Sequence, residues 1–105
     1  VYMTAVEDRL KASVLLGGCI DGSGLPEIKD VNYVGRVTVP TLMLNGKYDT
    51  LNPVETKIRP MFDLLGTPAA DKKLILYETD HIPPITEYIR ETLAWLDKYL
   101  GPVKR

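Results

Sequence analysis

The chain has 105 residues, of which 45% are hydrophobic and 26% charged, so it is long enough for one ordinary globular domain over residues 1–105. The net charge of −1 gives no reason to expect nucleic acid or an acidic membrane surface as a partner, and no apolar run approaches the roughly 18 residues that would cross a bilayer. The single cysteine, Cys19, excludes an internal disulfide and favours a reducing, cytoplasmic location. The chain has only one histidine in addition to this cysteine, which is too few ligands for a structural zinc site. We therefore expect no metal or other cofactor.

The first half of the chain predicts one helix end and two strands. Residues 1–8 are expected to be the end of a helix, and the apolar run 13–16, which stops at Gly17 and Gly18, a buried strand. Residues 19–39 are rich in glycine and proline and are expected to be mostly loop. A second strand is expected at 41–45, directly after a proline, which is tolerated at a strand start.

The second half predicts a helix, a strand and a longer helix. The first helix is expected to begin with Asn52 as N-cap and Pro53 at its first position, to be kinked by Pro60, and to end at Gly66. A strand at 73–77 follows. A last helix at 85–100 is expected to present one apolar face, made of Ile85, Tyr88, Ile89, Leu93, Leu96 and Leu100, and the core is expected to include Met3, Met43, Met61 and Trp95.

The three predicted strands are continuous apolar runs rather than alternating ones. This pattern is typical of a parallel sheet that is covered by helices on both faces. Together with the alternation of strands and helices, it predicts the α/β class, with a three-stranded, mostly parallel sheet and flanking helices.

Two chemically useful side chains follow neighbouring strands. Asp49 comes just after strand 41–45, and His81 comes just after strand 73–77. Since the carboxyl ends of parallel strands meet at one edge of a sheet, the two side chains are expected to lie there together. An aspartate that accepts a hydrogen bond from histidine fixes the imidazole tautomer and stabilises its protonated form during proton transfer. Taken singly, Asp49 is equally well explained as a turn residue and His81 as a loop residue.

The residues around Asp49 resemble the acid-bearing strand of the α/β hydrolases, which carries the pattern P-x-L-x-x-x-G-x-x-D, here from Pro40 to Asp49. Further stretches resemble the dienelactone-hydrolase and prolyl-oligopeptidase-like serine esterases, including domains fused to bacterial serine/threonine kinases; these are residues 6–14, 52–56, 64–68 and 92–103. The resemblance implies that the chain is the C-terminal portion of an α/β-hydrolase fold, with Asp49 as triad acid and His81 as triad base.

The chain departs from that family pattern in two places. The family usually has glycine just before the histidine, whereas Asp80 stands here, a carboxylate that is able to compete with Asp49 for the imidazole. The family's serine-bearing G-x-S-x-G turn would lie a few residues before Val1, so the expected nucleophile is not among these residues.

Three residues of the chain carry a hydroxyl or thiol that is a candidate replacement for that serine: Ser13, Ser23 and Cys19. Ser13 lies within a predicted strand, and Ser23 lies in a predicted turn that lacks the G-x-S-x-G pattern. Cys19 follows the strand at 13–16 on the same sheet edge, and a histidine can activate a thiol there. The plainer interpretation of Cys19 is a half-buried free cysteine.

Two functions remain open from the sequence. The first is the C-terminal part of a serine esterase, which hydrolyses an ester or related acyl bond in its full form and is inactive without its nucleophile. The second is a non-catalytic module that self-associates through the edge of strand 13–16, or that docks a complementary N-terminal hydrolase segment. A flavodoxin-like ligand-binding domain is disfavoured, because the glycine-containing stretch 22–26 is too short for a phosphate loop.

Overall fold

Three parallel strands form the centre of the structure, a computed structural model that describes residues 1–22 and 24–104. Ser23, and with it the predicted turn at that position, lies outside the described residues. The elements in chain order are α1 (Tyr2–Val6), β1 (Ser13–Leu16), the 3-10 turn η1 (Pro26–Ile28), α2 (Val31–Val34), β2 (Thr41–Gly46), the π-helical turn η2 (Val54–Ile58), α3 (Arg59–Leu64), the 3-10 turn η3 (Ala69–Asp71), β3 (Lys72–Tyr77) and α4 (Ile85–Leu100).

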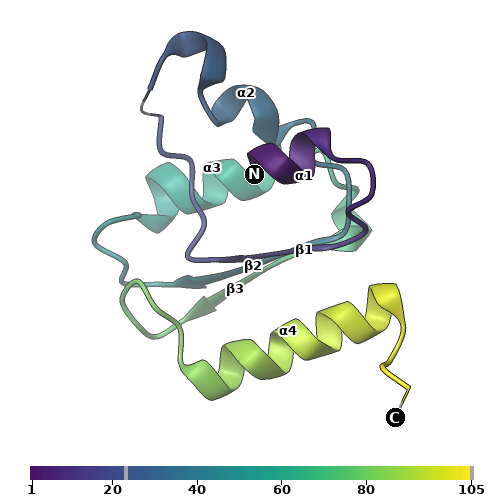
Figure 1. Ribbon diagram of the computed structural model, residues 1–105. Coiled ribbons are helices and arrows are strands. Elements are labelled where there is room, and N and C mark those ends of the chain that lie inside the picture. The colour runs from purple at the N-terminus through teal and green to yellow at the C-terminus, as the bar shows by residue number, and fades with distance from the viewer. Residues whose placement is uncertain (23, 105) are drawn as a thin grey trace.

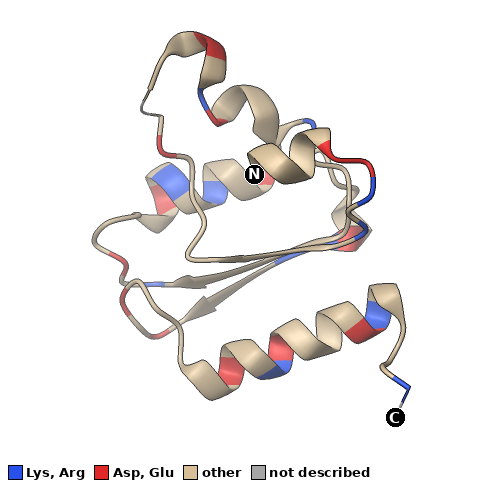
Figure 2. Cartoon of the chain, viewed as in Figure 1, with Lys and Arg blue, Asp and Glu red and all other residues tan. Residues whose placement is uncertain are grey.

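The sheet has the order β1-β2-β3, with both pairs parallel. Thr41 at the start of β2 is in register with Ser13 of β1 and Lys72 of β3, so the three carboxyl ends lie at one edge. All six residues of the central strand β2 are buried, and neither β1 nor β2 carries a charged residue (Figure 2). The predicted fold class, a three-stranded parallel sheet with flanking helices, is confirmed.

Helices cover both faces of this sheet, with α1, α2 and α3 on one face and α4 on the other (Figure 1). The first face packs around Met43 together with Val34, Val37, Ile58, Met61 and Leu65. The second face packs Trp95 of α4 against Leu42 and Leu44 of β2. Among the described residues, no helix combines the length and the apolar character needed to cross a membrane.

The helix predicted to begin at Asn52 is not capped by that residue. Pro53 holds the cap position, and its carbonyl accepts the N–H groups of Lys57 and Ile58, at 2.9 and 3.4 Å, in the wide turn η2. Instead of capping the helix, Asn52 donates its backbone N–H to the Asp49 carboxylate. Pro60 then falls in the first turn of α3, where its missing N–H is tolerated, and the π turn η2 directly precedes it. The kink expected at Pro60 stays a prediction.

The segment predicted as mostly loop contains one turn and one short helix, η1 and α2. Asp30 organises this segment, because its carboxylate accepts the N–H of Asp21 at 2.7 Å and that of Gly22 at 3.5 Å. A helix of four residues is too short to produce a periodic apolar pattern, which is why the sequence did not reveal α2.

The last helix has the predicted bounds but not the predicted buried face. The side chains that pack on the sheet are the aromatic Tyr88, Trp95 and Tyr99. Of the predicted apolar face, Tyr88 packs on the sheet as expected, whereas four other members are between 46% and 63% exposed: Ile85, Ile89, Leu93 and Leu100. The helix is therefore rotated from the predicted orientation toward the side that carries Trp95 and Tyr99. The expectation for Met3 was also wrong, since this side chain lies on the surface of α1.

Candidate active site

Asp49 and His81 lie together at the carboxyl edge of the sheet. The Nδ1 atom of His81 is 2.7 Å from the Oδ2 atom of Asp49. The Asp49 side chain is fully buried, whereas that of His81 is 37% exposed. The structure therefore brings together the two residues predicted from the sequence, one on the turn after β2 and the other on the turn after β3.

The Asp49 carboxylate is held by three hydrogen bonds. Besides the bond to His81, its Oδ1 atom accepts the backbone N–H groups of Leu51 and Asn52, each at 2.9 Å. Burial raises the pKa of Asp49, but the hydrogen bonds from His81, Asn52 and Leu51 outweigh it, so the pKa lies below its ordinary value. An ionised carboxylate can only accept, so Nδ1 of His81 is the donor of this bond, and in the neutral form of the ring Nε2 is the nitrogen that carries the free lone pair.

The end of β2 allows the turn that carries His81 to approach closely. A Cβ atom on Gly46 would lie 1.5 Å from the carbonyl oxygen of Asp80, so only glycine fits at this position. Two backbone bonds join the turns that follow β2 and β3: Lys47 N–H donates to Tyr77 O at 2.8 Å, and Tyr48 N–H donates to Thr79 O at 3.0 Å. The glycine of the acid-bearing motif thus positions the histidine as well as the acid.

The imidazole reaches across β2 to the end of β1. Gly17, which directly follows β1, has a φ of +68°, and a Cβ there would lie 3.1 Å from Cε1 and 3.4 Å from Nε2 of His81. Gly17 therefore lies next to the Cε1 edge of the ring, with Nε2 slightly nearer to it than Nδ1. Sequence reasoning used Gly17 only as a strand end. In the sequence, the feature that pointed to this contact is the pair of adjacent glycines, Gly17 and Gly18, directly after an apolar strand.

From the sequence, Asp80 was able to compete with Asp49 for the imidazole. In the structure it does not, because it binds a different group. Its Oδ1 atom accepts the backbone N–H of Thr50 at 3.2 Å, while the ring of His81 bonds to Asp49. The residue before the histidine is therefore tied to the residue after the acid. This bond is a second link between the two turns of the site, in addition to the His81–Asp49 contact.

Neither Cys19 nor Ser13 is bonded to His81 in the part of the chain that is described. Cys19 packs at the margin of the Met43 core, and burial raises the pKa of its thiol more than nearby Lys57 lowers it. Ser13 lies within β1, at the opposite end of that strand from Gly17. No described serine or cysteine is thus hydrogen-bonded to the His81–Asp49 pair, and Ser23 lies outside the described residues.

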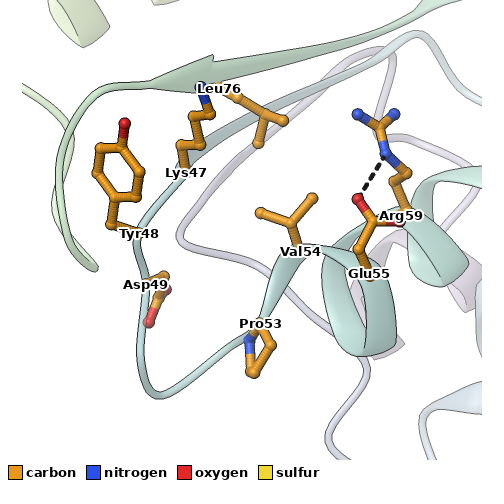
Figure 3. A pocket seen from close by; sticks show the side chains of 8 residues that line it. All are labelled: Lys47, Tyr48, Asp49, Pro53, Val54, Glu55, Arg59 and Leu76. Atoms are coloured by element: carbon orange, nitrogen blue, oxygen red, sulfur yellow. Dashed lines mark ion pairs between the residues drawn. The ribbon is translucent and has the colours of Figure 1, made fainter.

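A hollow lies beside Asp49, between the end of β2 and the turn η2 (Figure 3). Its lining residues are Lys47, Tyr48, Asp49, Pro53, Val54, Glu55, Arg59 and Leu76. The Asp49 carboxylate points away from Leu76 in this view. The basic groups of the hollow are already paired, Lys47 with Glu78 at 3.2 Å and Arg59 with Glu55 at 3.5 Å.

Within residues 1–22 and 24–104, no cluster of three or more His, Cys, Asp or Glu side chains is arranged to hold a metal ion.

No family model and no curated protein matches the chain. Solved structures of a novel cold-adapted esterase from an Arctic intertidal metagenomic library do match. The native structure has a TM-score of 0.77 at 26% identity, over 92% of this chain and 42% of that chain. The zinc-bound structure has a TM-score of 0.76 with the same identity and coverage, and the complex with PEG has 0.75 at 25% identity, over 91% of this chain and 39% of that chain.

These matches support the fold class and a general similarity between this chain and a part of an esterase. The three-stranded parallel sheet with its helices corresponds to part of an esterase structure, and the chain has a partial, α/β-hydrolase-like fold. The predicted resemblance to a hydrolase is confirmed at this level. The chain spans about two fifths of the length of the esterase structures that it matches.

Proposed function

We propose that Asp49 and His81 are the acid and the base of a serine-hydrolase triad, and that the chain acts as the C-terminal part of an esterase. The observation that carries this proposal is the 2.7 Å bond between His81 Nδ1 and Asp49 Oδ2, which leaves Nε2 as the acceptor in the neutral form of the ring. In such a site a serine attacks the acyl carbon, Nε2 takes the serine proton, and the ionised Asp49 stabilises the imidazolium that forms.

The nucleophile would come from outside the 105 residues. The Cε1 edge of the imidazole lies next to Gly17, which directly follows β1, an edge strand of the described sheet. A serine at the end of a strand added beside β1 would therefore lie near this part of the ring. Because most of the catalytic power is lost when the nucleophile is missing, the chain alone is expected to be inactive.

The same proposal extends to the subfamily of hydrolases, to the domains fused to the chain and to its cellular location. The stretches at 52–56, 64–68 and 92–103 favour the dienelactone-hydrolase and prolyl-oligopeptidase-like branch, with fusion to a bacterial kinase as one possible setting. The lone Cys19 favours a cytoplasmic location, which stays a prediction. The acyl substrate is left as an ester or related bond, because much of its pocket would come from the segment that carries the serine.

The coding sequence upstream of Val1 tests the proposal most directly. A G-x-S-x-G motif within about 20 residues of Val1, on a strand-to-helix turn, would supply the serine in the chain order Ser, Asp, His. An upstream sequence that encodes a different kind of domain would contradict the proposal.

An activity assay on the 105-residue chain gives a second test. With p-nitrophenyl acetate we expect neither a burst nor saturable turnover, because no serine among the described residues is bonded to His81. Saturable turnover that is lost in His81→Ala would contradict this expectation and would show that a residue of the chain itself replaces the serine.

A further inference from the structure

Asn45 is a polar residue near the carboxyl end of β2, and its side chain is fully buried. Its Nδ2 atom donates to Gly18 O at 2.9 Å, whereas its Oδ1 atom accepts from no group among the described residues. A buried polar atom without a partner is unfavourable, and an aliphatic side chain at this position would avoid that cost. Core packing alone therefore does not explain the amide, and its bond to Gly18 indicates its role.

This bond is made where the chain leaves β1. The N–H of Gly17 still donates to Leu44 O at 2.9 Å, but the φ of Gly17, +68°, ends the extended conformation there. The carbonyl of Gly18 lies beyond the backbone ladder, and the Asn45 amide supplies its donor. The Asn52 side chain adds a longer bond, from Nδ2 to Gly17 O at 3.5 Å. The two-glycine turn is thus held by side chains from β2 and from the segment after Asp49.

The same turn contacts the imidazole of His81. A Cβ atom on Gly17 would lie 3.1 Å from Cε1 and 3.4 Å from Nε2 of the ring. The ring is therefore restrained at two places, at Nδ1 by Asp49 and at its Cε1 edge by Gly17. A single hydrogen bond leaves a ring free to tilt about that bond, so the second contact decides where Nε2 points.

We propose that Asn45 is a positioning residue for His81. Its amide fixes the Gly17–Gly18 turn, and the turn fixes the orientation of the imidazole. Among the described hydrogen bonds none joins Asn45 to His81 or to Asp49, so the effect passes through the turn. The importance of this orientation for catalysis rests on the proposed function of His81 as the base, whereas the contact itself does not depend on it.

NMR spectroscopy on the 105-residue chain tests the contact directly. In wild type we expect a nuclear Overhauser effect between the Hα protons of Gly17 and the Hε1 proton of His81. Asn45→Leu keeps the branched shape of the side chain but cannot donate, so this signal should be lost while the chain stays folded. Asn45→Ala also lacks the donor and should give the same loss, which keeps the test decisive if leucine does not fit the buried site.

Asn45→Asp is the conservative variant that should restore the contact. Burial raises the pKa of the new carboxyl group, so at mildly acidic pH it stays protonated and its O–H can donate to Gly18 O. The signal between Gly17 and His81 should be retained under these conditions. A change in shape or packing alone would not produce this difference between Asn45→Asp and Asn45→Leu.

The matched control is Thr41→Val, at the opposite end of the same strand. Thr41 is also fully buried, and it loses a side-chain bond of equal length, 2.9 Å to Val39 O, so the signal at His81 should be unchanged. A signal that persists in Asn45→Leu and Asn45→Ala would overturn the proposal. Its loss in Thr41→Val, or in Asn45→Asp at acidic pH, would equally overturn it. An upstream sequence that contradicts the proposed function leaves these signals unaffected, so the two failures are distinguishable.

Discussion

His81 Nδ1 lies 2.7 Å from Asp49 Oδ2, although the two residues are 32 positions apart in the chain. The contact joins a fully buried carboxylate to an imidazole that keeps one side open to solvent. Two further features hold the pair in place, the glycine at position 46 and the bond from Thr50 N–H to Asp80. The five predictions below test the pair, its supports and the alternative nucleophile.

Replacement of Asp49 by asparagine should remove the charge that orients the imidazole. In wild type, the Nδ1 proton is shared with an ionised carboxylate and should give a far-downfield proton resonance in NMR spectra. Asp49→Asn should lose this resonance because a neutral amide is a weaker acceptor. His81→Ala is the control that assigns the signal, and a wild-type spectrum without it would contradict the geometry of the pair.

The stability of the chain should depend on pH through Asp49. Its pKa is lowered in the folded state, so its contribution is fully present above the unfolded-state pKa of about 3.9 and is lost as pH falls through the folded value. In this acid window the unfolded chain binds more protons, so stability rises with pH. Urea unfolding at a series of pH values below about 4 should show a steeper loss for wild type than for Asp49→Asn. Parallel curves for the two proteins would contradict the lowered pKa.

Gly46→Ala should damage both the fold and the site. The new Cβ would overlap the carbonyl oxygen of Asp80, so the turn that carries His81 must move, at a cost of roughly 1–3 kcal/mol or more of unfolding free energy. The downfield signal of the pair should weaken at the same time. Gly35→Ala is the matched control, since its Cβ would meet Leu64 O at an ordinary 3.8 Å and should cost little. Equal stability of the two variants would show that the approach at Gly46 is not restrictive.

Asp80→Ala should loosen the turn that follows the acid. The Thr50 N–H loses its acceptor, so its amide should exchange with solvent faster than in wild type, and the Leu51 and Asn52 amides should follow to a lesser degree. Asp80→Asn retains a side-chain oxygen at the same place and should behave like wild type. If Asp80→Ala left the exchange of Thr50 unchanged, Asp80 would not link the two turns.

Cys19 should behave as an ordinary half-buried thiol. Burial raises the pKa of its thiol, so little thiolate is present near neutral pH and alkylation should be slow. The rate should also be the same in His81→Ala, because no bond joins the two side chains among the described residues. Fast alkylation that depends on His81 would restore Cys19 as a candidate nucleophile.

The sequence alone determined the order of strands and helices, the class of the sheet and the sheet edge that holds the candidate site. Apolar runs at 13–16, 41–45 and 73–77 identify buried parallel strands, and a residue that follows such a strand must lie at its carboxyl edge. The bounds of α4 were equally clear, because a long periodic segment that ends at Gly101 leaves little freedom.

Tertiary structure alone decided which groups touch. The choice of Asp49 over Asp80 as partner of the imidazole, the contact of Gly17 with the ring and the bond from Thr50 to Asp80 depend on how the turns after β2 and β3 pack. The rotation of α4 likewise follows from aromatic rings that reach the sheet, which outweighed the aliphatic stripe visible in the sequence. Periodicity fixes the face and the edge on which a side chain lies, but contacts of about 3 Å between distant residues are set by strand register and by close backbone approach at glycine.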